Sequence, residues 1–412
     1  MPFLHERLPN GLDVIAETSA TAVSTSLGFF VKTGSRDESD AVWGVSHFLE
    51  HMIFKGTPEI SGDEINRRFD RMGASINAFT SEEDTVYYAT VLPDQQHEAF
   101  DLLARMMRPA LRESDFDTEK LVILEEIRMY DDQPPFGADD RCRAAFFGSH
   151  PLARSVLGTT DSIRALPVEA MRDYHRHRYA PGSIVLAASG AVDFPALVES
   201  ARRLCGDWEP VPTAARIVPA PPRRPATAAT ERIVRPTAAL DYAVRMVAGP
   251  DEHHPDREAA RLLAILLGDS SGSRLYWALV DSGEAEQAAC LHQDYLDAGL
   301  FVTQLSCDAA DVDPLLERIL DIYREAAGGI KPAEFERARN KLASRVVLAG
   351  EKPRRRLFEI GLDWSHSGIH RPVAELLHRV EALSLDDVRR VLDAWPLDGP
   401  AASVIAGPEA EG

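Results

Sequence analysis

The pattern of apolar and polar residues has the same layout in the two halves of the chain. In each half an apolar run leads through a polar turn into a segment of helical periodicity, at 24–54 and again at 239–268. Both halves then continue through further helical segments into a late apolar strand, at 183–192 and 401–407. Strands and helices that alternate without regular βαβ units are typical of α+β folds with largely antiparallel sheets. The pattern predicts two homologous α/β sandwich domains, each an antiparallel-rich sheet packed with helices, related by internal duplication.

A change in composition separates the two halves. The stretch EPVPTAARIVPAPPRRPATAAT holds six prolines and many small residues, which indicates a stiff, extended linker. We therefore expect an N-terminal domain over residues 1–207, a Pro-rich linker over 208–230 and a C-terminal domain over 231–412. Each half is long enough to bury a core of its own.

The charge balance narrows the choice of partners. There are 45 Lys and Arg residues against 65 Asp and Glu residues, which gives a formal net charge of −20. Nucleic acids and anionic membranes bind clustered positive charge, so we expect neither as a partner.

Four scattered cysteines fit neither a disulfide framework nor a CxxC metal site, and we expect buried thiols in a reducing compartment. No secretory signal is visible, so the expected compartment is the cytoplasm, or the periplasm if a signal has been removed.

One short motif carries metal chemistry. His47, Glu50 and His51 have the spacing H-x-x-E-H within a segment of helical periodicity. Positions i, i+3 and i+4 share one helix face, so two imidazoles can bind one metal with the glutamate beside its open position. Such a glutamate can take a proton from a water molecule whose pKa the metal lowers. The pattern favours a zinc peptidase site, and the alternative is a pair of solvated histidines on an exposed helix.

A third ligand is expected from another helix. The segment DFDTEKLVILEEIRMYDD places Glu119, Glu126 and Met129 on one face, and Glu125 about 100° away. Acidic residues in an otherwise apolar helix are costly to bury unless a cation pairs with them. The alternative is that these glutamates face water, in which case they indicate no metal site. Periodicity alone leaves the choice between Glu125 and Glu126 open.

Several ordered motifs resemble one peptidase family. GVSHFLEHMIFKGT, GASINAFTSEEDTVYYATVL and TEKLVILEEIRMYDDQP resemble the inverted-zincin peptidases, which include pitrilysin, insulysin, the mitochondrial processing peptidase and short bacterial relatives. The resemblance runs almost continuously from Asn10 to Val192 and more loosely over the second half. It implies a two-domain member of the family that forms half of a clamshell chamber.

The resemblance assigns roles to individual residues. His47 and His51 match the zinc-binding histidines, and Glu50 matches the general base. Glu126 matches the third ligand of Zn²⁺, and Glu119 matches a second glutamate that supports the catalytic site in relatives.

The same resemblance implies a site for the peptide substrate. Asn77 and Ala78, followed by Phe79, match the edge strand on which a substrate lies as an added β-strand. By themselves these residues favour plainer roles, a turn-proximal cap for Asn77 and a core aromatic for Phe79.

The second half departs from the family pattern. Relatives that act alone carry there an Arg followed seven residues later by a Tyr, and this pair grips the substrate. Here the Arg position is Leu279 or Val280, and the Tyr position is Glu286. Arg274 and Tyr276 lie nearby but match a structural segment of the family. The resemblance therefore implies a paralogous partner chain that supplies the Arg/Tyr pair.

These observations together predict a function. Large relatives enclose their substrate with four such units in one chain, whereas this chain holds two, so we expect a dimer, with the hetero form favoured over the homo form. The prediction is a zinc-dependent endopeptidase that hydrolyses short or unfolded peptides inside a dimeric chamber. The alternative is a non-catalytic or partner-dependent subunit of a heterodimeric peptidase complex.

Overall fold

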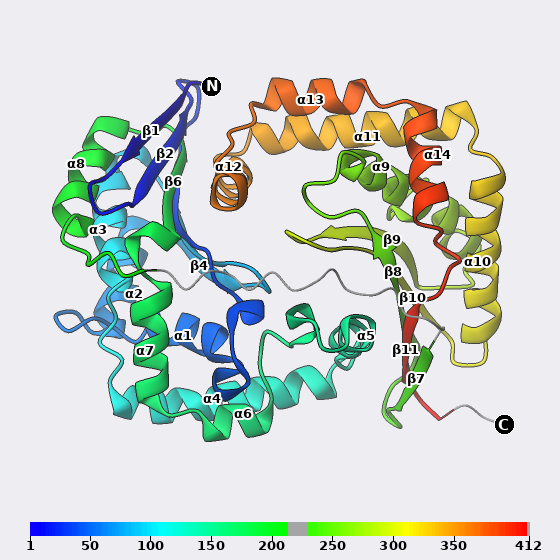
Figure 1. Ribbon diagram of the computed structural model, residues 1–412, viewed down its shortest axis with the longest axis horizontal. Helices are drawn as coiled ribbons and strands as arrows, with labels where there is room; N and C mark the ends of the chain where they lie inside the picture. The colour runs from blue at the N-terminus through cyan, green and yellow to red at the C-terminus, as the bar shows by residue number, and fades with distance from the viewer. Residues whose placement is uncertain (213–228, 410–412) are drawn as a thin grey trace. The chain divides into compact units, whose positions relative to one another are not determined.

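The chain forms two compact units, each built around one sheet (Figure 1). The computed structural model describes residues 1–212 and 229–409, so most of the predicted linker, at 213–228, lies outside the described residues. Within the described residues, the first unit comprises 1–128, 154–212 and 348–373, and the second comprises 129–153, 229–347 and 374–409.

The first unit holds a six-stranded sheet. Its strands are β1 (Phe3–Arg7), β2 (Asp13–Thr18), β3 (Thr25–Val31), β4 (Ser75–Thr80), β5 (Thr85–Val91) and β6 (Ile184–Gly190). They lie in the order β1-β2-β6-β3-β5-β4, and all neighbours pair antiparallel except β2 and β6. Every residue of β3 and β6 is buried, because both faces of the sheet are covered.

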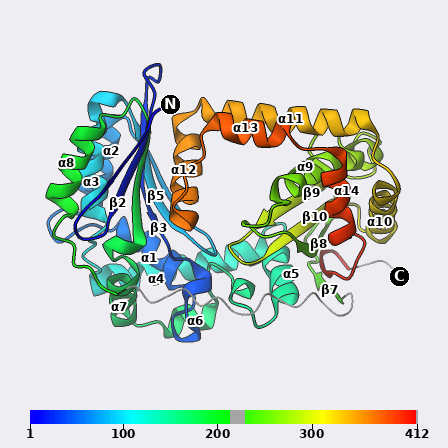
Figure 2. The same ribbon diagram turned by 45° about the horizontal axis from the view of Figure 1, so that its top comes forward.

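Helices cover both faces of this sheet. They are α1 (Val45–Ile53), α2 (Gly62–Met72), α3 (Gln96–Met106), α4 (Glu113–Asp132, which continues into the second unit), α6 (Thr160–Ala165), α7 (Val168–Arg178), α8 (Phe194–Cys205) and α12 (Pro353–Ser367). The main core joins one face to apolar residues of α1, α3, α7 and α8, whereas α12 covers the other face (Figure 2).

The second unit repeats this plan with five strands. They are β7 (Ala229–Val234), β8 (Asp241–Gly249), β9 (Gln287–Asp294), β10 (Gly299–Cys307) and β11 (Ala402–Gly407). Their order β7-β11-β8-β10-β9 reproduces β2-β6-β3-β5-β4, and the single parallel pair, β7 with β11, falls at the same place as β2 with β6. The predicted α+β class and the two similar sheet units are confirmed.

Helices accompany the sheet of the second unit as well. They are α5 (Ala138–Phe147), α9 (Arg257–Gly268), α10 (Val312–Gly328), α11 (Pro332–Gly350, whose last turn falls in the first unit), α13 (Val373–Glu381, whose first residue does so too) and α14 (Leu385–Ala394), with a π-helix at Tyr276–Val280. No helix in the described ranges combines the length and apolar character that a membrane span requires.

Two helices pack in the unit built mainly from the other half of the sequence. The helix α12 comes late in the chain yet packs on β3 and β6, and α5 comes early yet packs on β8 and β11. At α12 the reason is local, because Leu357 and Ile360 join a buried cluster with Phe30, and Gly361 leaves room for the ring of Phe30. Buried Arg356 makes a two-pronged ion pair with Glu17 of β2, at 2.5 and 2.7 Å. The boundaries predicted at residues 207 and 231 divide the chain into two consecutive segments. Each compact unit instead combines segments from both halves of the sequence, because α12 and α5 pack as described.

Candidate metal centre

The helix α1 is fixed firmly at both its start and its inner face. The buried carboxylate of Glu38 accepts hydrogen bonds from the backbone N–H groups of Gly44 and Ser46, both at 2.7 Å, where the unpaired N–H groups of a helix start need acceptors. Burial raises the pKa of Glu38 to about 8 despite these bonds. Phe48 and Leu49 are fully buried in the main core. The remaining face of α1 carries the H-x-x-E-H residues.

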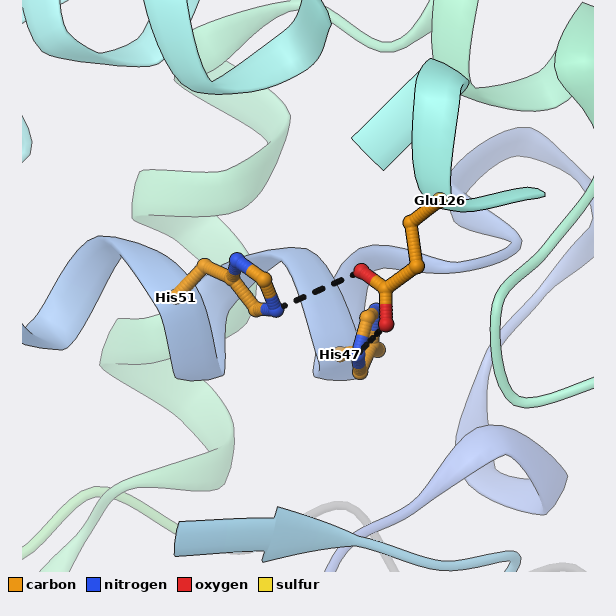
Figure 3. A group of neighbouring side chains, drawn as sticks. All are labelled: His47, His51 and Glu126. Atoms are coloured by element: carbon orange, nitrogen blue, oxygen red, sulfur yellow. Dashed lines mark ion pairs between the residues drawn. The ribbon is translucent and has the colours of Figure 1, made fainter. Parts of the chain in front are cut away.

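The two histidines of α1 and Glu126 of α4 converge on one point (Figure 3). His47 Nε2 lies 3.8 Å from one carboxylate oxygen of Glu126, and His51 Nε2 lies 3.6 Å from the other. These distances are too long for hydrogen bonds. They are close to the separation of about 3.4 Å between ligands on a tetrahedral zinc ion. Two imidazole nitrogens and one carboxylate therefore fit the protein donor set of a catalytic zinc site.

The electrostatics of His47 suit a metal ligand. Burial lowers its pKa to about 4, and the neighbouring charge of His51 acts in the same direction. The imidazole of His47 is therefore neutral at ordinary pH. Metals bind the neutral form, because the lone pair must be free.

Glu119 lies on the same face of α4 as Glu126 and contacts the opposite ring nitrogen of His51. Its Oε1 lies 2.9 Å from His51 Nδ1, and its Oε2 pairs with Lys55 Nζ at 2.5 Å. Burial opposes the ionisation of Glu119, but hydrogen bonds from Lys55 and His51 outweigh it and hold its pKa below the usual value. A carboxylate at Nδ1 fixes the ring so that Nε2 faces the metal position.

Glu50 lies beside this cluster on α1. Its Oε2 accepts a hydrogen bond from the hydroxyl of Thr80, at 2.5 Å. Burial raises the pKa of Glu50 above its usual value, with Thr80 and His51 opposing the effect and Glu126 adding to it. A half-buried carboxylate with a raised pKa can both accept and return a proton, which a general base in hydrolysis must do.

The geometry separates the two glutamates that helical periodicity left open. The side chain of Glu125 is 72% exposed and lies 3.8 Å from Arg128 on the outer face of α4. The side chain of Glu126 is 32% exposed and faces the two histidines. Among the acidic pair, Glu126 is thus the one placed to bind a metal.

The predicted substrate strand is an edge strand. In the part of the chain that the structure describes, β4 pairs with β5 and with no strand on its other side. Asn77 is exposed, and its side-chain oxygen accepts a hydrogen bond from the N–H of Ala78 at 2.9 Å. Phe79 is half-buried and packs edge-on against Phe358 of α12, with ring centroids 5.7 Å apart. Phe79 thus packs against a core cluster as its plainer role predicted, whereas Asn77 lies within the strand and does not cap a turn.

The second unit shows where the residues that depart from the family pattern lie. Leu279 is fully buried at the end of the π-helix, and Glu286 is exposed just before β9. Arg274 is held by Glu334, at 2.9 and 3.1 Å, and by the carbonyl of Gly329. It therefore has a structural ion pair here, as its position in the family pattern suggested.

Sequence reasoning missed two partners of the site, Thr80 and Lys55. Each had a signal within a quoted motif, since Thr80 ends NAFT and Lys55 lies four residues after His51. What the sequence did not show is that they contact Glu50 and Glu119. The four cysteines, by contrast, are unpaired and buried as predicted.

Two family models match the chain in succession. The model described as insulinase (peptidase family M16) matches residues 13–160, and the model described as peptidase M16 inactive domain matches residues 165–342. The chain belongs to peptidase family M16. The resemblance that the motifs suggested is thereby confirmed.

Curated relatives in this family span nearly the whole chain. An uncharacterized zinc protease of Streptomyces coelicolor is 33% identical, covering 97% of this chain and 88% of its own. A probable mitochondrial-processing peptidase subunit beta of Arabidopsis thaliana is 29% identical over 97% of this chain and 77% of its own. Relatives are thus named both as zinc proteases and as a subunit of a processing peptidase.

Solved structures of the family share the fold. A protease from Helicobacter pylori superposes with a TM-score of 0.91 at 22% identity, covering 99% of this chain and 100% of the other. A peptidase M16 inactive domain from Pseudomonas fluorescens gives 0.89 at 20% identity, with coverage of 100% and 98%. At these identities the likeness extends to the fold alone.

Proposed function

We propose that this chain is a zinc-dependent endopeptidase that hydrolyses short or unfolded peptides. The observation that carries the proposal is the convergence of one ligand atom each from His47, His51 and Glu126 within 4.8 Å of one another, with the two imidazoles 3.8 and 3.6 Å from the carboxylate oxygens of Glu126. Names of relatives that include "zinc protease" support the same chemistry.

The residues of the site divide the work of hydrolysis. His47, His51 and Glu126 would hold the zinc ion, and Glu119 would orient His51. A bound zinc ion polarises a carbonyl group and lowers the pKa of a water molecule, which is the chemistry that peptide hydrolysis needs. Glu50 would accept the proton of the attacking water and return it to the leaving amine.

The substrate would bind along β4. A free strand edge offers N–H and C=O groups in register, so an extended peptide can pair with Asn77, Ala78 and Phe79 as an added strand. Backbone pairing of this kind favours extended or unfolded peptides and imposes little requirement on their sequence.

A second subunit would complete the catalytic chamber. The Arg/Tyr pair of stand-alone relatives is absent from the sequence, where Leu279 or Val280 and Glu286 stand instead. Relatives named as subunit beta of a processing peptidase support assembly with another chain. We propose a dimer, with a paralogous partner that supplies the pair favoured over a second copy. Sedimentation of the chain alone and mixed with such a paralogue distinguishes the two.

The second candidate is a subunit that does not cut by itself. The missing Arg/Tyr pair favours it, because the chain then lacks the two side chains that grip the substrate in relatives that act alone. Chelator-sensitive cleavage by the purified chain contradicts this candidate. Stoichiometric zinc without cleavage supports it.

We further propose that the protein works in the cytoplasm. Four buried, unpaired cysteines support a reducing compartment. Fractionation of cells that express the full gene product tests this assignment.

The experiment that tests the endopeptidase is cleavage of a mixed pool of quenched peptides with and without a zinc chelator. Glu50→Gln keeps the size and the metal ligands but removes the base, so turnover should fall by at least about 1000-fold while zinc stays bound. Glu125→Gln is the matched control, since Glu125 points away from the site. Cleavage at the wild-type rate by Glu50→Gln would refute the assigned mechanism.

A further inference from the structure

We infer that Thr80 is a positioning residue for the general base, fixing the carboxylate of Glu50 from the end of the strand that receives substrate. The inference rests on the proposed function and adds a role that neither the sequence motifs nor the family comparison assigned.

The contact between the two side chains is short and specific. The Thr80 hydroxyl donates to Glu50 Oε2 at 2.5 Å, the length of a strong hydrogen bond to an ionised acceptor. Among the residues that the structure describes, Thr80 is the one hydrogen-bond partner of the Glu50 side chain. Because Oε2 is engaged, Oε1 is the oxygen that remains to take a proton from water.

Thr80 is itself held by the β4–β5 hairpin. It is the last residue of β4 and pairs with Thr85 across the hairpin. The turn that follows is closed by the N–H of Ser81 donating to the carbonyl of Asp84 at 2.8 Å, and by the Ser81 hydroxyl accepting from the N–H of Asp84 at 3.0 Å. A β-branched threonine at such a fixed backbone position has few rotamers, so its hydroxyl points in a defined direction.

Two further contacts brace the turn from outside the hairpin. Gly34 approaches so closely that a Cβ there would lie 2.3 Å from the carbonyl oxygen of Ser81. On the other side, His366 of α12 lies 2.6 Å from Asp84, between Nε2 and Oδ2. The turn next to the donor is therefore also held by Gly34 and by α12, and not only by its neighbours within the hairpin.

This arrangement links substrate binding to the orientation of the base. The strand whose free edge would pair with a peptide ends in the hydroxyl that holds Glu50. A peptide added at Asn77 and Phe79 is thereby brought into register with the proton acceptor. Thr80 should consequently affect the chemical step more than the affinity for substrate.

The test compares Thr80→Val with Thr80→Ser. Valine matches threonine in shape but has no hydroxyl, whereas serine keeps the hydroxyl. We expect kcat for peptide cleavage to fall about 10- to 100-fold in Thr80→Val, the effect of one hydrogen bond to a charged group, and to stay within about threefold of wild type in Thr80→Ser. KM and zinc stoichiometry should stay within about twofold in both variants.

Thr90→Val serves as the control for hydroxyl loss in the same sheet, because Thr90 bonds Ser26 at 2.8 Å on β3 and does not contact Glu50. It should cleave like wild type. Equal kcat for Thr80→Val and wild type overturns the inference alone. Loss of zinc or of folding in Thr80→Val and Thr80→Ser alike also overturns it, since the role would then be structural. A wild-type chain that shows no chelator-sensitive cleavage overturns the proposed function, and the role of Thr80 falls with it.

Discussion

The helix pair α1–α4 of the first unit and the pair α9–α11 of the second unit are each joined by an ion pair, but the charges are placed on opposite helices. In the first pair, Lys55 follows α1 and binds Glu119 of α4 at 2.5 Å. In the second, the charges are reversed, since Asp269 follows α9 and binds Lys341 and Arg345 of α11, at 2.8 and 2.5 Å. Both pairs are joined by an ion pair at the end of the shorter helix.

Buried positions align the two long helices residue by residue. Phe116, Glu119 and Ile123 are buried in α4 at the spacing of Phe335, Ala338 and Leu342 in α11. In this register Ala338 replaces Glu119, and Arg345 replaces Glu126. The second pair therefore carries its own cations, whereas the first brings a carboxylate to two imidazoles. The difference teaches that the position which holds a cationic side chain, Arg345, in the second pair holds in the first a carboxylate, Glu126, that faces two imidazoles.

The largest expected effect follows from removing that carboxylate. Glu126→Gln should lose stoichiometric zinc and lower peptide cleavage by more than about 1000-fold, because two imidazoles alone bind zinc weakly. Metal analysis after dialysis measures the first effect, and the quenched-peptide assay measures the second. Glu125→Gln is the control one residue away and should match wild type in both. Retention of zinc by Glu126→Gln would contradict the third-ligand assignment.

A smaller effect on zinc binding is expected from Glu119, which contacts the ligand His51 and is not itself a proposed ligand. Glu119→Gln keeps the shape of the side chain but weakens its hold on His51, so zinc affinity should fall about 10- to 100-fold. Competition with a chromophoric chelator measures the affinity. Ala338→Gly, at the corresponding position of the second pair, should leave zinc affinity unchanged. Equal affinities for Glu119→Gln and wild type would show that Glu119 is not needed to orient the ring.

The smallest effect concerns the second pair and bears on stability alone. Asp269→Asn removes the anion shared by Lys341 and Arg345 and should lower the free energy of unfolding by about 2 kcal/mol without changing zinc content. Burial opposes the ionisation of Asp269, but hydrogen bonds from Lys341 and Arg345 prevail and hold its pKa below the usual value. Because the folded pKa lies below the unfolded one, this stabilisation is present above about pH 4 and is lost as the pH falls further.

Urea unfolding of both proteins over a range of pH checks this prediction. The difference in unfolding free energy between wild type and Asp269→Asn should be constant near neutral pH and shrink below about pH 4. A zinc content that falls in Asp269→Asn would mean that the two helix pairs are not independent.

Much of the fold and of the candidate site could be predicted from the sequence. The apolar runs at 24–54 and 239–268 became strand and helix in each unit, and the late strands at 183–192 and 401–407 became β6 and β11. Helical spacing alone was enough to place His47, Glu50 and His51 on one face. It could not choose between Glu125 and Glu126, because the two differ by only 100° on a helix whose buried side depends on its neighbours.

The sequence by itself determined the local elements, the grouping of the H-x-x-E-H side chains on one helix face and the repetition of one plan in two halves, because these depend on residue periodicity and residue type. Only the tertiary structure decided that α5 and α12 pack in the opposite unit, that Thr80 holds Glu50 and that Lys55 holds Glu119. The physical reason is that these contacts join residues at least 30 positions apart in the sequence. The side chains of Thr80 and Glu50, and those of Lys55 and Glu119, nevertheless lie 2.5 Å apart in the folded chain. Packing across the sheet brings such residues together, and no local pattern records it.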